Sequence, residues 1–285
     1  MTRALGFILV SAFAVPAFAD TPIDETRPLN PDAKVSVSNC AGAIHVQAWD
    51  KNVLSLTGHL GEGVEKLVID GDPSKLRIEV KLPKTSHNVE ETVLQLKVPA
   101  GVSLDLESVS ADVAVQGTKG ALKANTVSGD LTLQVGSPKV SAQTVSGDLH
   151  LEAPSRDTQL KSVSGDMIVQ GAQGELVGET VSGNLSVDAA SLSKLWLKSV
   201  SGDFNVRAAL NDAGHAQLET LSGEVDLALP SNTNAAVDLS SFSGELDSDL
   251  GSIPSDTHKA TLKLGNGNGQ VSIHSFSGDI QLKKK

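Results

Sequence analysis

The side chains in this sequence best suited to chemistry form a column of acids, one in each copy of a repeated Val-Ser-Gly-Asp phrase. The residues at this place are Asp112, Asp130, Asp148, Asp166, Asn184, Asp203, Glu224, Glu245 and Asp279. Calcium could compensate like charges stacked in register, because it binds several carboxylate oxygens. Calcium-binding β-rolls carry an acid about every nine residues, however, whereas this chain carries one in about eighteen and loses the charge at Asn184. We therefore expect the acids to cap turns through backbone hydrogen bonds and expect no metal site.

The rest of the chain shows no catalytic or metal-binding pattern. Serine recurs beside aspartate as a ladder and never within a G-x-S-x-G elbow. None of the seven histidines pairs with another at the i, i+4 spacing of a zinc site. Sugar binding favours exposed aromatic rings, and only Trp49 and an outward-facing Trp196 could supply a tryptophan. We expect no catalytic, cofactor-binding or metal-ligating residues.

The repeated phrase has a nearly fixed period, which is typical of a repeat architecture. Its copies begin at Val109, Val127, Val145, Val163, Val181, Val200, Leu221, Phe242 and Phe276. Counting each first residue as position zero, apolar residues recur at positions −5, −3, zero, +4 and +6, as in Leu122, Ala124, Val127, Leu131 and Leu133. Alternation by two predicts strands, so each copy offers two short strands facing one core, with Ser-Gly-Asp at the corner between them. We predict that position zero faces the core.

Stacking of these units predicts an all-β, parallel single-stranded β-solenoid, similar to a β-helix. A triangular helix of hexapeptides has the same period, but six-residue steps from Val127 reach Leu133 and then the polar Lys139. Glycine fills position +2 in every copy except the one with Ala111. Glycine permits positive φ or close packing of the backbone, and Ala111 shows that positive φ is not needed in every copy.

The first nineteen residues have the pattern of a signal peptide. Arg3 precedes a short apolar run, and Ala17-Phe18-Ala19 forms a cleavage site before Asp20. We expect an exported protein that is periplasmic, outer-surface or secreted, with no transmembrane segment. The net charge of −11 argues against nucleic acid and anionic membranes as partners.

The remaining chain divides into three expected parts. Residues 20–33 form an extended lead-in, residues 34–100 an irregular N-terminal β capping module, and residues 101–285 the solenoid repeats. An insertion at 251–270 predicts a terminal hairpin, because two pairs of apolar residues flank a glycine-rich turn. Cys40 matches position zero of an early copy and is expected to pack in the core. Lys283, Lys284 and Lys285 are expected near an open edge, where lysine discourages end-to-end pairing.

The Val-Ser-Gly-Asp repeats resemble the bacterial "putative adhesin" family, a domain of unknown function with tandem β-strand repeats. The segment Asn39 to Val46, followed by Trp49-Asp50, is also similar to that family's opening strand pair. The resemblance covers about residues 34–285 and implies a single-stranded β-solenoid. It supplies no catalytic or ligand residues.

These observations favour a non-enzymatic exported repeat protein, an adhesin or envelope interaction scaffold that presents sheet faces and Ser-Gly-Asp corners. Its expected partner is an envelope or surface protein or glycan. A self-assembling structural envelope protein is the first alternative, since the rods could associate through ends or faces. A polysaccharide-active solenoid enzyme is the second alternative.

Overall fold

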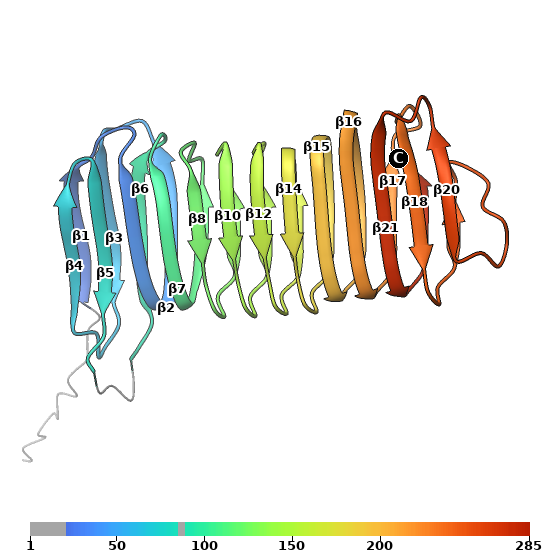
Figure 1. Ribbon diagram of the computed structural model, residues 1–285. Helices are drawn as coiled ribbons and strands as arrows, with labels where there is room; N and C mark the ends of the chain where they lie inside the picture. The colour runs from blue at the N-terminus through green and yellow to red at the C-terminus, as the bar shows by residue number, and fades with distance from the viewer. Residues whose placement is uncertain (1–20, 85–88) are drawn as a thin grey trace, which may run out of the picture.

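The computed structural model describes residues 21–84 and 89–285, which form a long all-β rod (Figure 1). These residues hold twenty-two strands and no helix, so the all-β prediction is confirmed. Most pairings between strands are parallel, and the strands stack like the turns of a solenoid. The expected signal peptide at 1–19 lies outside the described residues.

The middle of the rod consists of two parallel sheets on either side of one core. Its short strands are Leu122–Asn125 (β8), Leu131–Gln134 (β9), Lys139–Gln143 (β10), Leu149–Glu152 (β11), Asp157–Lys161 (β12), Met167–Gln170 (β13) and Gln173–Glu179 (β14). We call the strand segments before each Ser-Gly-Asp corner the leading sheet and those after it the trailing sheet. In the leading sheet, β8 pairs with β10, β10 with β12 and β12 with β14. In the trailing sheet, β9 pairs with β11 and β11 with β13.

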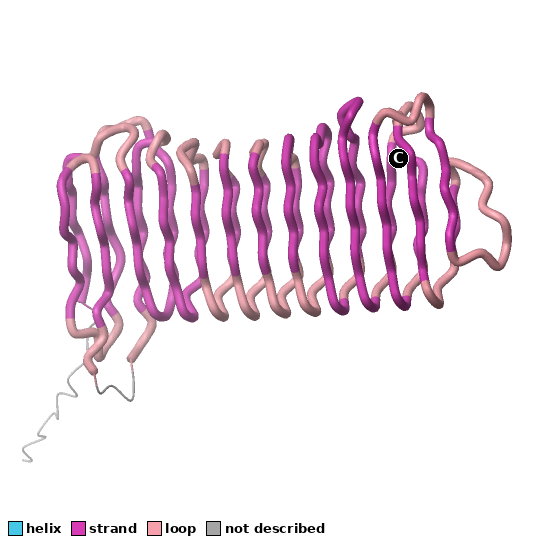
Figure 2. The backbone as a smooth tube through the Cα atoms, viewed as in Figure 1, coloured by secondary structure: helices cyan, strands magenta, loops and turns pink. Residues whose placement is uncertain are grey.

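Four longer strands continue through a corner or a turn and so belong to both sheets. They are Lys34–Trp49 (β2), Ser103–Gln116 (β7), Leu185–Ser201 (β15) and Phe204–Ser222 (β16). Figure 2 shows the corners as a row of turns along one edge of the rod. Each turn of the chain therefore contributes one strand to each sheet, and we call such a turn a rung.

The core confirms most of the alternation seen in the sequence. The side chains at positions −5, −3, +4 and +6 around Val127 are all buried, with exposed fractions of 2% or less: Leu122, Ala124, Leu131 and Leu133. The same holds for Leu195, Leu197, Phe204 and Val206 around Val200. Stacking of identical positions makes one continuous apolar core along the rod.

The N-terminal end closes the rod with antiparallel strands. They are Thr21–Pro28 (β1), Val53–Leu60 (β3), Lys66–Asp72 (β4), Lys75–Lys81 (β5) and Thr92–Pro99 (β6). In the trailing sheet β6 lies beside β2, β3 pairs antiparallel with β6, and β1 pairs antiparallel with β3. The lead-in is therefore an edge strand, and its Pro22 and Pro28 suit an edge because proline cannot donate a backbone hydrogen bond.

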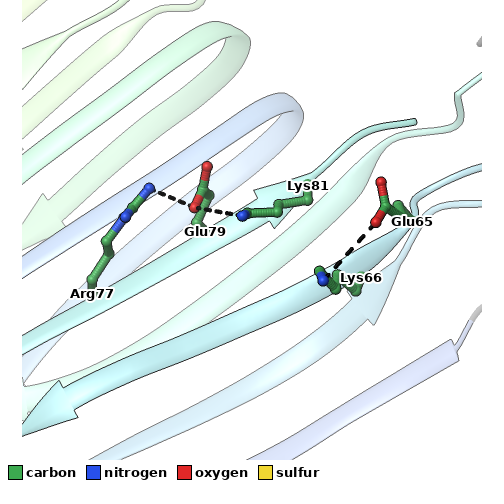
Figure 3. A network of polar contacts seen from close by, with 5 residues as sticks. All are labelled: Glu65, Lys66, Arg77, Glu79 and Lys81. Atoms are coloured by element: carbon green, nitrogen blue, oxygen red, sulfur yellow. Dashed lines mark hydrogen bonds and ion pairs between the residues drawn. The ribbon is translucent and has the colours of Figure 1, made fainter. Parts of the chain in front are cut away.

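The leading sheet ends at the β4–β5 hairpin, which carries a row of charged side chains (Figure 3). Glu79 accepts contacts from Arg77 at 2.6 Å and Lys81 at 3.9 Å, and Lys66 lies 4.0 Å from Glu65. In the turn, Asp72 accepts hydrogen bonds from the Ser74 hydroxyl and from the backbone N–H groups of Ser74 and Lys75, which lower the pKa of that carboxyl. Charges at an edge strand oppose the addition of another strand.

At the C-terminal end the spatial order of the strands departs from the order of the chain. The strands are Val225–Leu229 (β17), Ala235–Ser241 (β18), Leu246–Ser248 (β19), Lys259–Leu264 (β20), Gly269–Ser277 (β21) and Ile280–Lys284 (β22). The last rung, β21 and β22, inserts between two earlier ones: β21 pairs with β16 and β18, and β22 pairs with β17 and β19. Figure 1 shows β21 between β16 and β18, with β20 outermost.

This insertion corrects the expected hairpin and gives the terminal lysines their partners. The hairpin across 251–270 does not form, because β20 pairs antiparallel with one side of β18 while β21 pairs with the other side. The terminal lysines are enclosed on one side only, because β22 pairs with β17 through Ile280–Lys284 but with β19 only through Ile280–Leu282. Lys283 contacts Asp226 at 2.7 Å, and Lys285 contacts Asp188 at 3.1 Å.

Candidate functional site

The acidic column connects neighbouring rungs through the backbone. The Oδ1 atom of each Asp or Asn from Asp112 to Asp203 accepts a hydrogen bond from the backbone N–H at the same position of the next rung, at 2.8 to 3.0 Å. Asp279 binds the N–H of Glu245 in the same way at 2.8 Å. The prediction that these side chains accept backbone hydrogen bonds is confirmed, but the bonds join neighbouring rungs and do not cap the residue's own turn. Within residues 21–84 and 89–285, no three His, Cys, Asp or Glu side chains are placed to hold a metal ion.

Asp148→Asn is expected to change the free energy of unfolding by less than about 0.5 kcal/mol, because an amide oxygen accepts the same hydrogen bond. Asn184 already does so, with its Oδ1 atom 3.0 Å from the Asp203 nitrogen. Asp148→Ala removes the acceptor and is expected to cost about 1 kcal/mol. Urea unfolding of both variants with and without calcium checks this. A loss in Asp148→Asn that appears only with calcium would contradict a purely structural column.

Position zero faces the solvent, which contradicts the prediction that it packs in the core. Val127, Val145 and Val163 are 44%, 40% and 43% exposed. The reason is parity: side chains that share a face of a strand are separated by even steps, and zero is an odd step from −3. The inward face continues through position −1 instead, which is buried at Thr126 and Thr144.

The buried position −1 is a functional feature of the corner that the sequence analysis missed. It is Ser or Thr in every copy: Ser108, Thr126, Thr144, Ser162, Thr180, Ser199, Thr220, Ser241 and Ser275. In several rungs its hydroxyl accepts a hydrogen bond from the N–H at position +2, as Thr144 does from Gly147 at 3.0 Å. The invariable hydroxyl one residue before the phrase was the signal that could have identified it.

The glycines at position +2 are required by close packing of the backbone. A Cβ atom at Gly147 would overlap the carbonyl oxygen of Gly129, and one at Gly165 would overlap that of Gly147. Neither glycine has positive φ. Successive corners therefore stack backbone on backbone, which holds position zero of every rung in one line.

The resulting line of exposed apolar side chains is the main surface feature of the rod. We call it the ridge; in spatial order it consists of Val109, Val127, Val145, Val163, Val181, Val200, Leu221, Phe276 and Phe242. Phe276 and Phe242 stack with ring centroids 4.8 Å apart. Among the described residues, Ile168 is the one other large apolar side chain that is strongly exposed. Soluble proteins rarely expose a contiguous apolar surface of this kind.

A groove of about 500 Å³ runs beside the ridge on its leading-sheet side. The ridge residues Val145, Val163, Val181 and Val200 form one wall. The opposite wall is position −2, with Gln143, Lys161, Glu179 and Lys198, and the buried hydroxyls of position −1 form the floor. Lys161 and Glu179 pair within this wall at 2.9 Å.

A second hollow of about 640 Å³ crosses the leading sheet near the N-terminal end. We call it the basic trough. Its floor consists of the small residues Ser36, Ser103, Ala121 and Ser141, and five cations line it: Lys34, Lys75, Arg77, Lys123 and Lys139. Asp105 is the carboxylate within it and lies 3.4 Å from Lys123. Arg77 and Lys139 also pair with carboxylates, Glu79 at 2.6 Å and Asp157 at 2.8 Å, so much of the positive charge of the trough is compensated within the chain.

Two residues singled out in the sequence occupy less distinctive places. Trp196 points outward between buried Leu195 and Leu197, as expected, and is half-buried beside His215. Cys40 is half-buried at the N-terminal end of the ridge and does not occupy the core, which corrects the prediction. The cause is again position zero, which faces outward. A search for helices that are long and apolar enough to span a membrane finds none in the described part of the chain.

Solved structures that align with most of this chain do so at low sequence identity and with TM-scores below 0.5. A "putative lipid binding protein" of Parabacteroides distasonis is 14% identical, with a TM-score of 0.47, and the alignment covers 92% of this chain and 96% of the other. A "putative adhesin" of Bacteroides fragilis is 14% identical, with a TM-score of 0.43 and coverage of 93% and 98%. A "putative adhesin" of Parabacteroides merdae is 12% identical, with a TM-score of 0.34 and coverage of 93% and 99%.

Comparison of the sequence with models of protein families identifies the family of this chain, which the solved structures do not. No curated protein matches the chain. The model of the Toastrack DUF4097 domain, in contrast, matches residues 34–175 and 77–283. The matched residues include the N-terminal cap and all nine copies of the repeated phrase. The chain therefore belongs to the Toastrack DUF4097 family.

Proposed function

We propose that this protein is a non-enzymatic, exported scaffold that binds other components of the bacterial envelope through its long surfaces, in the manner of an adhesin. The ridge is the observation that carries the proposal. Nine apolar side chains in one line are costly to expose to water unless something covers them, so the rod has a built-in docking surface. We also propose that the stacked rungs form a single-stranded β-solenoid closed by the N-terminal cap.

Two further observations support this function. The basic trough adds a second hollow on the leading sheet, where Lys34, Lys75 and neighbouring hydroxyls are placed to contact an anionic glycan or an acidic protein segment. The acids that could have served catalysis or calcium binding are instead engaged by backbone N–H groups. Export is supported by Arg3, the apolar run after it and the Ala17-Phe18-Ala19 site.

In-cell photo-crosslinking tests the proposal. A photoreactive amino acid is placed at Val163 on the ridge, at Ser141 in the basic trough and at Ile168, which is 42% exposed on the trailing sheet outside both. We expect reproducible capture of an envelope protein or glycan from Val163 or Ser141 and none from Ile168.

Mass spectrometry of the crosslinked material separates the outcomes. Copies of this chain as the sole product at both test positions would replace the scaffold with the self-assembling structural alternative. Equal capture at all three positions, or none at any, would reject a docking surface.

A further inference from the structure

A hollow of about 310 Å³ lies on the outer face of the leading sheet and shares no lining residue with the basic trough or with the groove beside the ridge. Trp196 and polar side chains of β14, β15 and β16 line it. We propose that this hollow, which we call the Trp196 hollow, binds a neutral sugar unit of an envelope glycan. The inference goes beyond the proposed function, which places partners on the ridge and in the trough.

Two rows of side chains from three neighbouring strands form the site. In the parallel register, Lys194 of β15 lies between Glu175 of β14 and His215 of β16. Two residues further along, Trp196 lies beside Gln217 of β16. Neighbouring strands are about 4.8 Å apart and alternate residues about 6.6 Å apart along a strand, so the site measures roughly 10 Å by 7 Å. A hollow of this size suits a small ligand and is too small for a folded partner.

The regular repeat is interrupted at this site. Four steps of 18 residues precede it, whereas the steps from Val181 to Val200 and from Val200 to Leu221 are 19 and 21 residues long. In the described strands, the additional residues lie beside the hollow: Ser193 is left without a partner on β14, and residues 211–214 are left without partners on β15. Figure 1 shows β16 extending past β14 at the edge opposite the corners. Irregularities of this kind redirect side chains and are frequent next to functional sites.

Trp196 supplies an apolar platform in the hollow. Its side chain is half-buried on the outer face of the sheet. One face of a sugar ring consists largely of C–H groups, which are attracted to the negative face of an aromatic ring. The other tryptophan, Trp49, is already engaged, because its indole N–H donates to the carbonyl of Val53 at 2.9 Å and the Lys51 ammonium lies 5.1 Å from its ring centroid. Trp196 is therefore the tryptophan available for stacking.

The polar groups around the platform have free hydrogen-bonding capacity. Among the residues that the structure describes, Glu175 and Lys194 are neighbours in the register but form no ion pair, and the indole N–H of Trp196 has no acceptor. The carboxylate accepts hydrogen bonds, whereas the ammonium group and the indole N–H donate them. Sugar hydroxyls both donate and accept, so one sugar unit can engage all three groups.

The charges in the hollow favour a neutral ligand. Glu175 and Lys194 carry opposite charges, and His215 carries no formal charge at pH 7. An acidic sugar would meet the carboxylate of Glu175, and a cationic ligand would meet the ammonium group of Lys194, and like charges brought together oppose binding. A neutral hexose avoids both conflicts and keeps every hydrogen bond.

Isothermal titration calorimetry of the chain from residue 20 to 285 tests the site with maltohexaose, cellohexaose, mannohexaose and chitohexaose, and with an oligogalacturonate as the acidic counterpart. We expect at least one neutral oligosaccharide to bind with a Kd below about 1 mM, and the oligogalacturonate to bind about tenfold more weakly. Trp196→Ala is expected to weaken binding of the neutral sugar about tenfold or more. Trp196→Phe should restore most of the affinity, because the smaller ring still stacks.

Trp49→Ala is the matched control, because it removes the other tryptophan, which ends β2 in the N-terminal part of the rod. It should leave the affinity unchanged, and circular dichroism confirms that each variant folds. Equal losses in Trp49→Ala and Trp196→Ala, or no binding of any neutral oligosaccharide at about 10 mM, would overturn the proposal. Binding of the oligogalacturonate alone would overturn the assignment of a neutral ligand.

The outcomes separate this inference from the proposed function, because the titration uses purified protein. Protein that binds none of these sugars but captures an envelope component from Val163 or Ser141 would reject the Trp196 site and keep the scaffold. Sugar binding that depends on Trp196, without capture at either position, would keep the sugar site and reject docking through the ridge and the trough.

Discussion

Leu149→Asp is expected to destabilise the rod by more than about 4 kcal/mol, enough to prevent the middle rungs from folding. Leu149 is 1% exposed at position +4 of its rung and packs between the equivalent Leu131 and Met167 of the neighbouring rungs. The substitution buries a carboxylate with no partner in a core made of stacked apolar side chains. Circular dichroism, together with urea unfolding of whatever fraction folds, measures the effect.

Val145→Asp is the control for this experiment, because it introduces the same charge four residues earlier in the same rung. Val145 is 40% exposed on the ridge, so the carboxylate stays in water and the unfolding free energy should change by less than about 1 kcal/mol. Similar stabilities for the two variants would contradict the assignment of position zero to the outside of the corner. A wild-type-like Leu149→Asp would contradict the core itself.

Deletion of residues 269–285 is expected to unfold the C-terminal end of the rod while the middle rungs persist. The deletion removes β21 and β22, which lie between β16–β17 on one side and β18–β19 on the other. Without them the segment from Ala235 to Leu264 keeps the β18–β20 pairing but loses its attachment to the rest of the core. An isolated two-stranded hairpin is at most marginally stable in water.

Hydrogen exchange followed by mass spectrometry measures this effect. Amides of β18 should exchange in the deletion variant at the rate of unstructured chain, whereas amides of β10 and β12 should keep their protection. Deletion of Lys284 and Lys285 alone is the control, because it removes one ion pair, between Lys285 and Asp188, and keeps most of the β17–β22 pairing. Slow exchange of β18 in the long deletion would show that the inserted rung does not hold the end of the rod together.

The regular part of the fold could be predicted because its information is local and repeated. Alternation by two identified the buried residues at −5, −3, +4 and +6, and the 18-residue period identified the register, since Leu122 pairs with Val140 and Leu131 with Leu149. Within such segments the chemistry of neighbouring residues determines which face is buried.

The prediction failed where local patterns compete or where distant segments pair. At position zero the apolar character of Val145 suggested burial, but its odd spacing from Ala142, which is buried at −3, places it on the outside. The hydroxyl of Thr144 one residue earlier is the inward group, and its polarity concealed that role. At the C-terminal end, Leu262 and Val271 flank a glycine-rich turn that predicted a hairpin, yet β18 lies between them.

In the candidate site too, the features set by local sequence could be predicted and those made by contacts between rungs could not. The sequence correctly predicted that the acids accept backbone hydrogen bonds. The general rule for Asp and Asn at corners concerns bonds within one turn, whereas the observed bonds join neighbouring rungs. The sequence could not reveal the ridge, which exists because backbone stacking at the position +2 glycines aligns position zero of every rung. A surface made by stacking is a property of neighbouring rungs, and no single copy of the phrase contains it.

The inserted last rung also governs when the molecule can be completed. The chain grows from its N-terminus, so β18, β19 and β20 are synthesised before the two strands that must lie between them and the rest of the rod. The slot beside β16 therefore stays vacant until the last two strands arrive. During that interval the two sheets end in unpaired edges that fit the β21–β22 segment of any copy. The strands β21 and β22 therefore join the rod last. Copies that fold close together can exchange this segment with one another.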